Sequence, residues 1–193
     1  MARAESELDS AAADVAAGDY GQAVLDYRRA WRSAVEAVGE ARFSTFNASL
    51  NRSNAGDLAR ELSNPGSGQP AAIAEIIQRT RPDVLLINEF DYDAAGVSAR
   101  LFQRNYLSIG QGGADPIEYP FVYTAPSNTG VFSGFDLDNS GAAGDFVPND
   151  SFGFGFFPGQ YGMAVYSMHP IDVDDVRTFQ KFLWKDMPGA LLP

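Results

Sequence analysis

The sequence predicts an α/β protein in which helices flank a layered sheet. Residues 42–47 alternate between apolar and polar side chains, as a half-buried strand does. Residues 69–80 carry apolar side chains at helical spacing, and residues 84–87 form an unbroken apolar run, typical of a strand buried on both faces. A strand, a helix and a second strand in succession indicate a sheet with a helix packed on it.

The composition excludes several classes of protein. The 193 residues, of which 45% are hydrophobic and 20% charged, suffice for one folded domain with a small appendage. The net charge of -11 excludes a nucleic-acid binder that relies on a basic surface, although a nuclease stays compatible because bound divalent cations change the local sign. The absence of cysteine excludes disulfides and thiolate metal sites.

No membrane or targeting segment is predicted. No stretch approaches the roughly 20 apolar residues that a membrane span needs. Residues 1–20 contain several carboxylates and no apolar core of the kind that a signal peptide has. The sequence therefore leaves the localisation open.

Residues 1–40 predict a helical hairpin or linker that precedes a domain formed by residues 41–193. Helices are expected over residues 5–17 and 20–39, with a break at Gly18-Asp19. The second helix has one apolar face, formed by Tyr20, Ala23, Val24, Tyr27, Trp31, Ala34, Val35 and Val38. We expect that face to pack against the domain or against a neighbouring molecule, with its aromatic residues serving packing rather than ligand binding.

Further elements are expected along the domain. In the helix over residues 69–80, the side chains expected to face the core are Ile73, Ile76 and Ile77, and those expected to face solvent are Glu75, Gln78 and Arg79. Residues 110–157 are rich in Gly, Asn, Asp, Ser and Phe and predict a long irregular insertion. The other expected elements are short helices at 57–62 and 97–105, strands at 119–123 and 161–167, and a strand or extended edge at 172–185.

Two carboxylates follow the buried strand. The strand ends at Asn88, and Glu89 and Asp91 come directly after it. Such a strand delivers these side chains to the rim of the sheet, where loops on a rigid scaffold carry function. The alternative is that both residues are the solvated start of a loop.

Three motifs, in their order along the chain, resemble the endonuclease/exonuclease/phosphatase superfamily, the metal-dependent phosphoesterases related to pancreatic DNase. The motifs are Thr45-Phe46-Asn47, residues 81–91 (RPDVLLINEFD) and residues 160–167 (QYGMAVYS). For the bacterial branch of large exported members, the resemblance extends over nearly all of residues 41–193. It implies an α+β fold that is the N-terminal part of a DNase-like two-layer β-sandwich flanked by helices and preceded by the hairpin.

The resemblance implies divalent-metal-dependent hydrolysis of a phosphate ester, with Mg²⁺ or Mn²⁺ as cofactor. Glu89 stands where the family keeps its metal-binding glutamate. Mg²⁺ prefers one or two carboxylates plus waters, so Glu89 is the expected ligand, and Asn47 is expected to orient a second metal position or the scissile phosphate. Asp91 is either a further ligand or an exposed loop carboxylate, and Asn47 has the alternative role of capping a turn.

The family's remaining catalytic motifs, an aspartate–asparagine pair and a serine–aspartate–histidine ending, belong to a second half of the sandwich that we expect this chain to lack. Its single histidine, His169, does not fall at the position of the catalytic histidine and is expected to be structural or at the surface. Without a histidine–aspartate pair for proton transfer, we expect an incomplete phosphoesterase. The alternative is a truncated or degenerate binding module without catalysis.

Partners are expected at two places. A half-sandwich leaves an open sheet edge and uncovered apolar surface, which predicts self-association or a partner there or at the N-terminal hairpin. The substrate is a phosphate ester whose class the loops determine, and a resemblance of fold does not decide it.

The long insertion also contains a partial match to a calcium loop. The residues that match positions one, three, five and six of an EF-hand-type loop are Asp136, Asp138, Ser140 and Gly141. Position twelve is Val147 instead of glutamate, and no helix pair flanks the loop, although Asp145 and Asp150 could add oxygens. A polar turn held by aspartate and asparagine side chains is the alternative.

Overall fold

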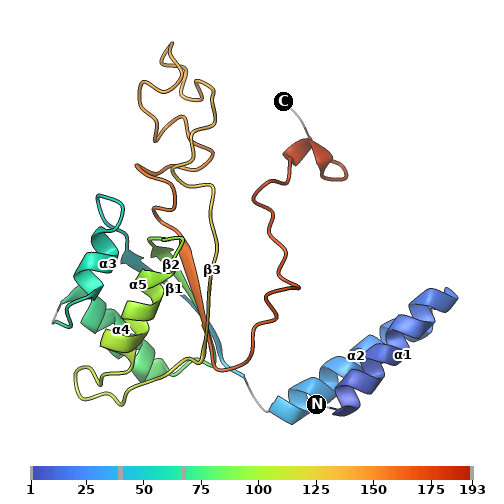
Figure 1. Ribbon diagram of the computed structural model, residues 1–193. Helices are drawn as coiled ribbons and strands as arrows, with labels where there is room; N and C mark the ends of the chain where they lie inside the picture. Colours follow the sequence, from blue (N-terminus) through green and yellow to red (C-terminus); the bar gives the residue numbers. More distant parts are fainter. Residues whose placement is uncertain (1, 39–40, 67, 192–193) are drawn as a thin grey trace. The chain divides into compact units, whose positions relative to one another are not determined.

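The computed structural model describes residues 2–38, 41–66 and 68–191. The chain divides into two compact units, residues 1–42 and residues 43–193. The first unit is a hairpin of two helices, α1 (Ala2–Ala17) and α2 (Tyr20–Val38), which Figure 1 shows side by side. The expected end of the second helix at residue 39 lies outside the described residues.

The hairpin has a seam of small residues and leaves large ones exposed. Its buried apolar residues are Ala4, Ala11, Ala23 and Ala30. Trp31 and Tyr20, in contrast, are 72% and 68% exposed. The predicted apolar face of α2 is therefore divided between a buried alanine row and an aromatic row that nothing within the hairpin covers.

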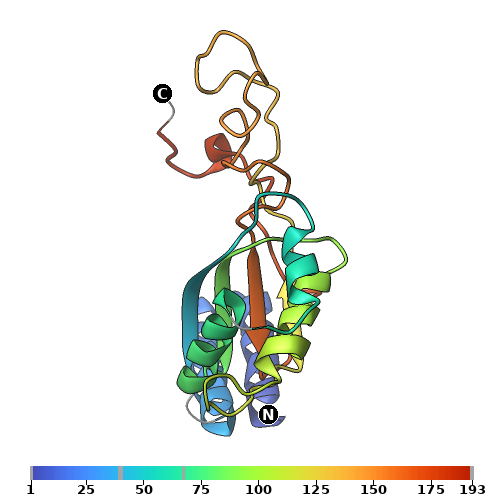
Figure 2. The same ribbon diagram turned by 90° about the vertical axis from the view of Figure 1, so that its left-hand side faces the viewer.

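The second unit contains a four-stranded mixed sheet, which confirms the predicted α/β fold class. Its strands are β1 (Phe43–Leu50), β2 (Val84–Phe90), β3 (Phe121–Thr124) and β4 (Met163–Ser167), in the order β1-β2-β4-β3. β1 and β2 are parallel, whereas β4 is antiparallel to both of its neighbours. Figures 1 and 2 show the helices α3 (Asp57–Leu62), α4 (Gln69–Thr80) and α5 (Val97–Phe102) on one face of the sheet.

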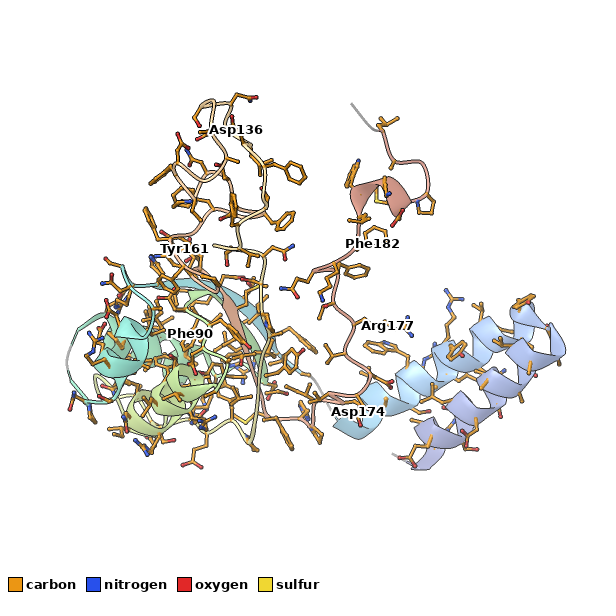
Figure 3. The ribbon with its side chains drawn as sticks, turned by 45° about the horizontal axis from the view of Figure 1, so that its top comes forward. Phe90, Asp136, Tyr161, Asp174, Arg177 and Phe182 are labelled. Atoms are coloured by element: carbon orange, nitrogen blue, oxygen red, sulfur yellow. The ribbon has the colours of Figure 1, made fainter. Side chains whose placement is uncertain are left out.

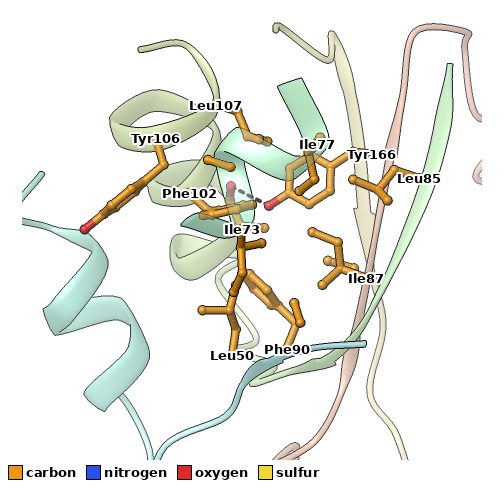
Figure 4. Close-up of a cluster of buried hydrophobic side chains, with 14 of the residues drawn as sticks. Leu50, Ile73, Ile77, Leu85, Ile87, Phe90, Phe102, Tyr106, Leu107 and Tyr166 are labelled. Atoms are coloured by element: carbon orange, nitrogen blue, oxygen red, sulfur yellow. Dashed lines mark hydrogen bonds between the residues drawn. The ribbon is translucent and has the colours of Figure 1, made fainter. Parts of the chain in front are cut away.

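The core lies between the sheet and these helices (Figure 4). Phe102 of α5 is fully buried and makes edge contacts with Phe90 and Tyr166, at ring-centre distances of 6.1 and 6.2 Å. The Tyr166 hydroxyl donates a hydrogen bond of 2.9 Å to the carbonyl of Ala99, so this buried polar atom is satisfied. Burial raises the pKa of Tyr166 well above its usual value.

The opposite face of the sheet is more open. Phe43 in β1 is 75% exposed, and Met163 in β4 is also exposed. The C-terminal segment runs along part of this face. There the Asn128 side chain donates a hydrogen bond to the backbone carbonyl of Gln180, and the Gln180 side chain donates one to the backbone carbonyl of Ser127. A cavity of about 480 Å³ lies there between the sheet and the segment, lined by residues that include Leu86 and Val165.

Two residues of α4 differ from expectation. Ile76 was expected in the core but is exposed. Ile73 and Ile77 are four residues apart and define the buried side of the helix, and Ile76 is turned away from Ile77 by about 100°. Gln78 was expected in solvent but is buried. Its side-chain amide donates to the backbone carbonyls of Leu107 and Ile109 and accepts from the backbone N–H of Gln111. The loop after α5 therefore supplies the partners that the burial of Gln78 requires.

Several boundaries also differ. β1 continues to Leu50, beyond the expected end at residue 47, and the predicted helix at 97–105 becomes α5 followed by a π-helical turn, Gln103–Leu107. Residues 172–183 form no strand, because their apolar residues recur about every third position and cannot line one face of a pleated strand. Within the described ranges, no helix combines the length and the hydropathy needed to cross a membrane.

Candidate active site at the ends of β1 and β2

The parallel strands β1 and β2 bring Asn47 and Glu89 to the same edge of the sheet. Their ladder is regular from Phe43 opposite Val84 to Asn47 opposite Asn88. It then shifts by one residue before Leu50 pairs with Phe90, which is a β-bulge in β1. Because the carboxyl ends of parallel strands meet, Asn47 and Glu89 are in direct contact.

Three side chains hold one another at this edge. The Asn47 amide donates a hydrogen bond of 2.8 Å to Oε1 of Glu89, and the Ser49 hydroxyl donates one of 3.2 Å to Oε2. The side-chain oxygen of Asn47, Oδ1, in turn accepts a hydrogen bond from the backbone N–H of Ser49 at 3.1 Å. The Glu89 carboxylate is therefore held from both sides, while its residue stays partly exposed to solvent.

The backbone around the site is unusual. Ser49, Glu89 and Tyr161 have positive φ angles of 52°, 55° and 55°. Each such conformation costs a non-glycine residue on the order of 1 kcal/mol or more and persists only where surrounding contacts impose it. The first two angles occur at the bulge and aim the Ser49 and Glu89 side chains at one another. Concentrated backbone strain of this kind is typical of functional sites.

Asp91 occupies a different environment from Glu89. It is 5% exposed, and its two oxygens accept hydrogen bonds from the backbone N–H groups of Arg52 at 2.6 Å and Tyr161 at 3.1 Å. Burial raises the pKa of Asp91 above its usual value, and the two backbone hydrogen bonds oppose the rise. The carboxylate thus ties the loop after β1 to the segment before β4, and it does not join Glu89 and Asn47.

A polar hollow of about 360 Å³ adjoins these tied segments. It is lined by Asn51, Arg52, Ser53, Phe156, Gln160 and Tyr161. The buried Gln160 donates to the Arg52 carbonyl at 2.7 Å and accepts from the Phe156 N–H at 2.7 Å, which joins the base of the long loop to the bulge strand. Gln160 therefore fixes one wall of the hollow by its hydrogen bonds to the backbone of Arg52 and Phe156.

His169 lies at the opposite end of the sheet. β4 runs antiparallel to β2, so Met163 pairs with Asn88 at the site and Ser167 pairs with Val84 at the far end. His169 follows Ser167, whose hydroxyl bonds to the backbone N–H and carbonyl of His169. The only histidine of the chain is therefore not available to Glu89.

The predicted calcium loop forms an acidic cluster that is remote from Glu89. Figure 3 shows Asp136 on the loop that projects beyond the sheet, apart from the labelled Phe90. Carboxylate oxygens of Asp136, Asp138 and Asp150 lie within 4.8 Å of one another. Ser140 contributes its backbone N–H to Asp136 at 3.0 Å and to Asp138 at 3.1 Å, so it stabilises the turn.

Every carboxylate oxygen of this cluster already accepts a hydrogen bond within the loop. The donors to Asp136 are the N–H groups of residues 140 and 141, and those to Asp150 are the N–H groups of residues 137 and 144. Asp138 accepts from the Ser140 N–H and from the Asn149 amide. This arrangement suits a turn held by aspartate side chains, and a cation would have to use the remaining lone pairs.

Comparison with known proteins identifies the family. A sequence model of the endonuclease/exonuclease/phosphatase family matches residues 44–193, which include the sheet except for Phe43 and contain both Asn47 and Glu89. The chain belongs to this family. Neither the curated proteins nor the solved structures gave a match to the chain.

Sequence reasoning missed Ser49 and Gln160. Ser49 lies two residues after Asn47, but the bulge between residues 47 and 50 interrupts the strand alternation there, so the contact of Ser49 with Glu89 left no periodic signal. Gln160 gave no such signal either, because its partners Arg52 and Phe156 are set by how two distant segments meet.

Proposed function

We propose that the edge formed by Asn47, Ser49 and Glu89 is the metal-binding side of a divalent-metal-dependent phosphoesterase site. The observation that carries the proposal is the Glu89 carboxylate, held by Asn47 and Ser49 at the ends of two parallel strands in a chain of this family. Oxygen ligands on a rigid scaffold are what Mg²⁺ and Mn²⁺ prefer.

The donor set fits such an ion. A carboxylate has about four lone-pair positions, of which Asn47 and Ser49 occupy two, so each oxygen of Glu89 retains a position for a cation. The Asn47 amide has a second N–H that is free of Glu89 and suits a phosphate oxygen. When bound, the metal would supply positive charge that polarises the phosphoryl group.

The roles of the side chains follow from these contacts. Glu89 holds the cation, Ser49 and Asn47 fix the orientation of the carboxylate, and Asn47 positions the phosphate. Asp91 acts through the backbone by fixing Arg52 and Tyr161 on either side of the hollow. The polar hollow beside them accommodates the remainder of a phosphate ester, whose class these contacts do not specify.

A second candidate function is binding of metal and phosphate without turnover. It is favoured by the position of His169 at the far end of β4, which leaves Glu89 without a histidine for general acid–base catalysis. The two functions make the same prediction for metal binding and differ only in hydrolysis.

The experiment combines metal binding and turnover in one set of variants. Mn²⁺ affinity is measured by calorimetry, and hydrolysis of a generic phosphodiester and phosphomonoester is followed with Mg²⁺ or Mn²⁺. We expect Glu89→Gln to weaken Mn²⁺ binding at least tenfold, because an uncharged amide replaces the anionic ligand. Glu118→Gln, an exposed glutamate outside the site, is the matched control and should bind as the unsubstituted chain does.

The outcomes separate the alternatives. Turnover that depends on metal and disappears in Glu89→Gln supports the phosphoesterase. Binding that depends on Glu89 without turnover supports the binding module. Mn²⁺ affinity equal in both variants would remove the site from Glu89 altogether.

A further inference from the structure

The N-terminal hairpin has an apolar face that its own helices do not cover. On α2 the exposed apolar row consists of Tyr20, Val24, Tyr27, Trp31 and Val35. On α1 the exposed apolar residues are Leu8 and Val15, seven residues apart. Tryptophan and tyrosine in such rows are the residues that most often dominate the energy of protein interfaces.

Both rows lie on the same side of the hairpin. The seam is marked by Ala4 and Ala11 of α1, with the partly buried Glu7 and Asp14, and by Ala23, Asp26 and Ala30 of α2. Leu8 and Val15 each follow a seam position by one residue, and so do Val24, Tyr27 and Trp31. One residue turns a helix by 100°, and because the two helices run antiparallel, these equal turns bring both rows to one face.

The hairpin is too small to be stable with such a face in water. Its unit spans 42 residues, has no cysteine, and buries alanines where a typical helical pair buries larger side chains. Units near this size normally need a disulfide, a metal or association with another surface. The apolar face is the surface through which association would occur.

Charge indicates what associates with it. α1 carries four carboxylates and one arginine, whereas α2 carries three arginines and two carboxylates. Asp9 follows Leu8, and Arg28 and Arg32 follow Tyr27 and Trp31, so these exposed charges lie at the outer edges of the apolar face. Glu5 lies one turn before Asp9 on the same edge. One edge is therefore acidic and the other basic.

We propose that a second copy of this chain covers the face, with the two hairpins forming a four-helix bundle. A twofold axis parallel to the helices places α1 of each copy antiparallel on α2 of the other, so that the acidic edge meets the basic edge. The other twofold arrangement, with its axis across the helices, would place the acidic α1 on its own copy. Four-helix bundles of antiparallel neighbours are a common solution for such amphipathic pairs.

The register of the hairpin specifies the pairs. The turn at Gly18 and Asp19 places residue 9 of α1 level with residue 28 of α2, and residue 5 level with residue 32. An axis parallel to the helices preserves these levels. Asp9 of the partner subunit thus meets Arg28, and Glu5 of the partner subunit meets Arg32, each pair occurring twice in the dimer. The inference is independent of the phosphoester site.

The first test is the mass of the full chain in solution, by sedimentation equilibrium over a range of concentrations. We expect a dimer, and we expect Trp31→Ser to raise its dissociation constant on the order of a hundredfold, since each dimer loses two central aromatic side chains. Ile76→Ser is the matched control. Ile76 is 48% exposed on α4 of the larger unit, outside the hairpin, so its loss should leave the mass unchanged.

The second test reverses charge. Arg28→Glu with Arg32→Glu should weaken the dimer about tenfold or more by placing like charges together, and Glu5→Arg with Asp9→Arg should do the same. Mixing these two double variants should give a heterodimer, because each acidic helix then faces a basic one. Circular dichroism of each variant establishes that the helices remain.

Three results would overturn the proposal. One is a chain that stays monomeric at every concentration. Another is a monomer in which Trp31→Ser lowers the melting temperature, which would mean that the face packs on the chain's own larger unit. The third is a dimer that neither the charge reversals nor Trp31→Ser weaken, which would place the interface elsewhere on the chain.

Discussion

The two faces of the sheet come from the same four strands and differ in what covers them. On the helix side, Phe102 and Ile77 close over Leu85 and Tyr166, and the largest side chains are fully buried. On the other side, Phe43 of β1 is three-quarters exposed. Alternation along a strand assigns residues to faces, but it does not say which face will be covered.

The helices show the same contrast. α4 and α2 are both amphipathic, yet α4 buries Ile73 and Ile77 against the sheet, whereas α2 buries alanines and exposes Trp31. The closed regions owe their burial to contacts between distant segments. The open regions of the chain, which are the second face, the hairpin and the projecting loop, therefore present the surfaces on which partners and ligands can act.

The sharpest test of this comparison substitutes one residue type on each face. Phe102→Ala should lower the free energy of unfolding by about 3–5 kcal/mol, through lost burial and the cavity left among Phe90, Tyr106 and Tyr166. Phe43→Ala should cost less than about 1 kcal/mol, because its ring is largely in solvent already. Urea unfolding of both variants measures the difference, and equal losses would mean that the second face is covered in solution.

A smaller effect is expected from pH, and it contrasts a buried with an exposed carboxylate. Burial raises the folded-state pKa of Asp91, so its protonated form favours folding below the usual pKa, and this contribution is lost as pH rises through the raised value. The Asn149 amide lowers the pKa of the exposed Asp138, whose contribution is present above the usual pKa and is lost as pH falls through the lowered value.

The variants Asp91→Asn and Asp138→Asn separate these contributions. Between pH 3 and pH 6, conditions chosen to bracket the usual aspartate pKa of about 3.9, the stability of the unsubstituted chain relative to Asp91→Asn should fall as pH rises. Relative to Asp138→Asn it should rise. If both differences had the same sign, burial would not dominate the pKa of Asp91, as its 5% exposure indicates that it does.

The smallest effect is expected for calcium at the projecting loop. Since Val147 stands where a calcium loop has its bidentate glutamate, we expect about 1 mM Ca²⁺, the range of weak extracellular sites, to leave the melting temperature unchanged. A rise in melting temperature that the double substitution Asp136→Asn with Asp138→Asn abolishes would instead establish a calcium site.

The candidate site could be predicted in part. Asn47 and Glu89 lie near the carboxyl ends of two strands whose patterns are legible in the sequence, and parallel pairing brings such ends together without further information. The bulge, the positive φ of Ser49 and Glu89, and the two hydrogen bonds that orient the carboxylate depend on the shift in register between the strands. Register shifts leave no periodic signal in a sequence.

What the sequence by itself determined is local: the two N-terminal helices, the helix over residues 69–80, the apolar strand that begins at Val84, and the absence of a second histidine. Only the tertiary structure decided that Gln78 is buried, that Ile76 is exposed, that Asp91 ties two loops, and that α1 does not cover the aromatic row of α2 within the hairpin. Periodicity arises from the geometry of a single element. Burial and hydrogen-bond partners arise from segments that meet across the fold, and no property of one segment specifies its neighbour.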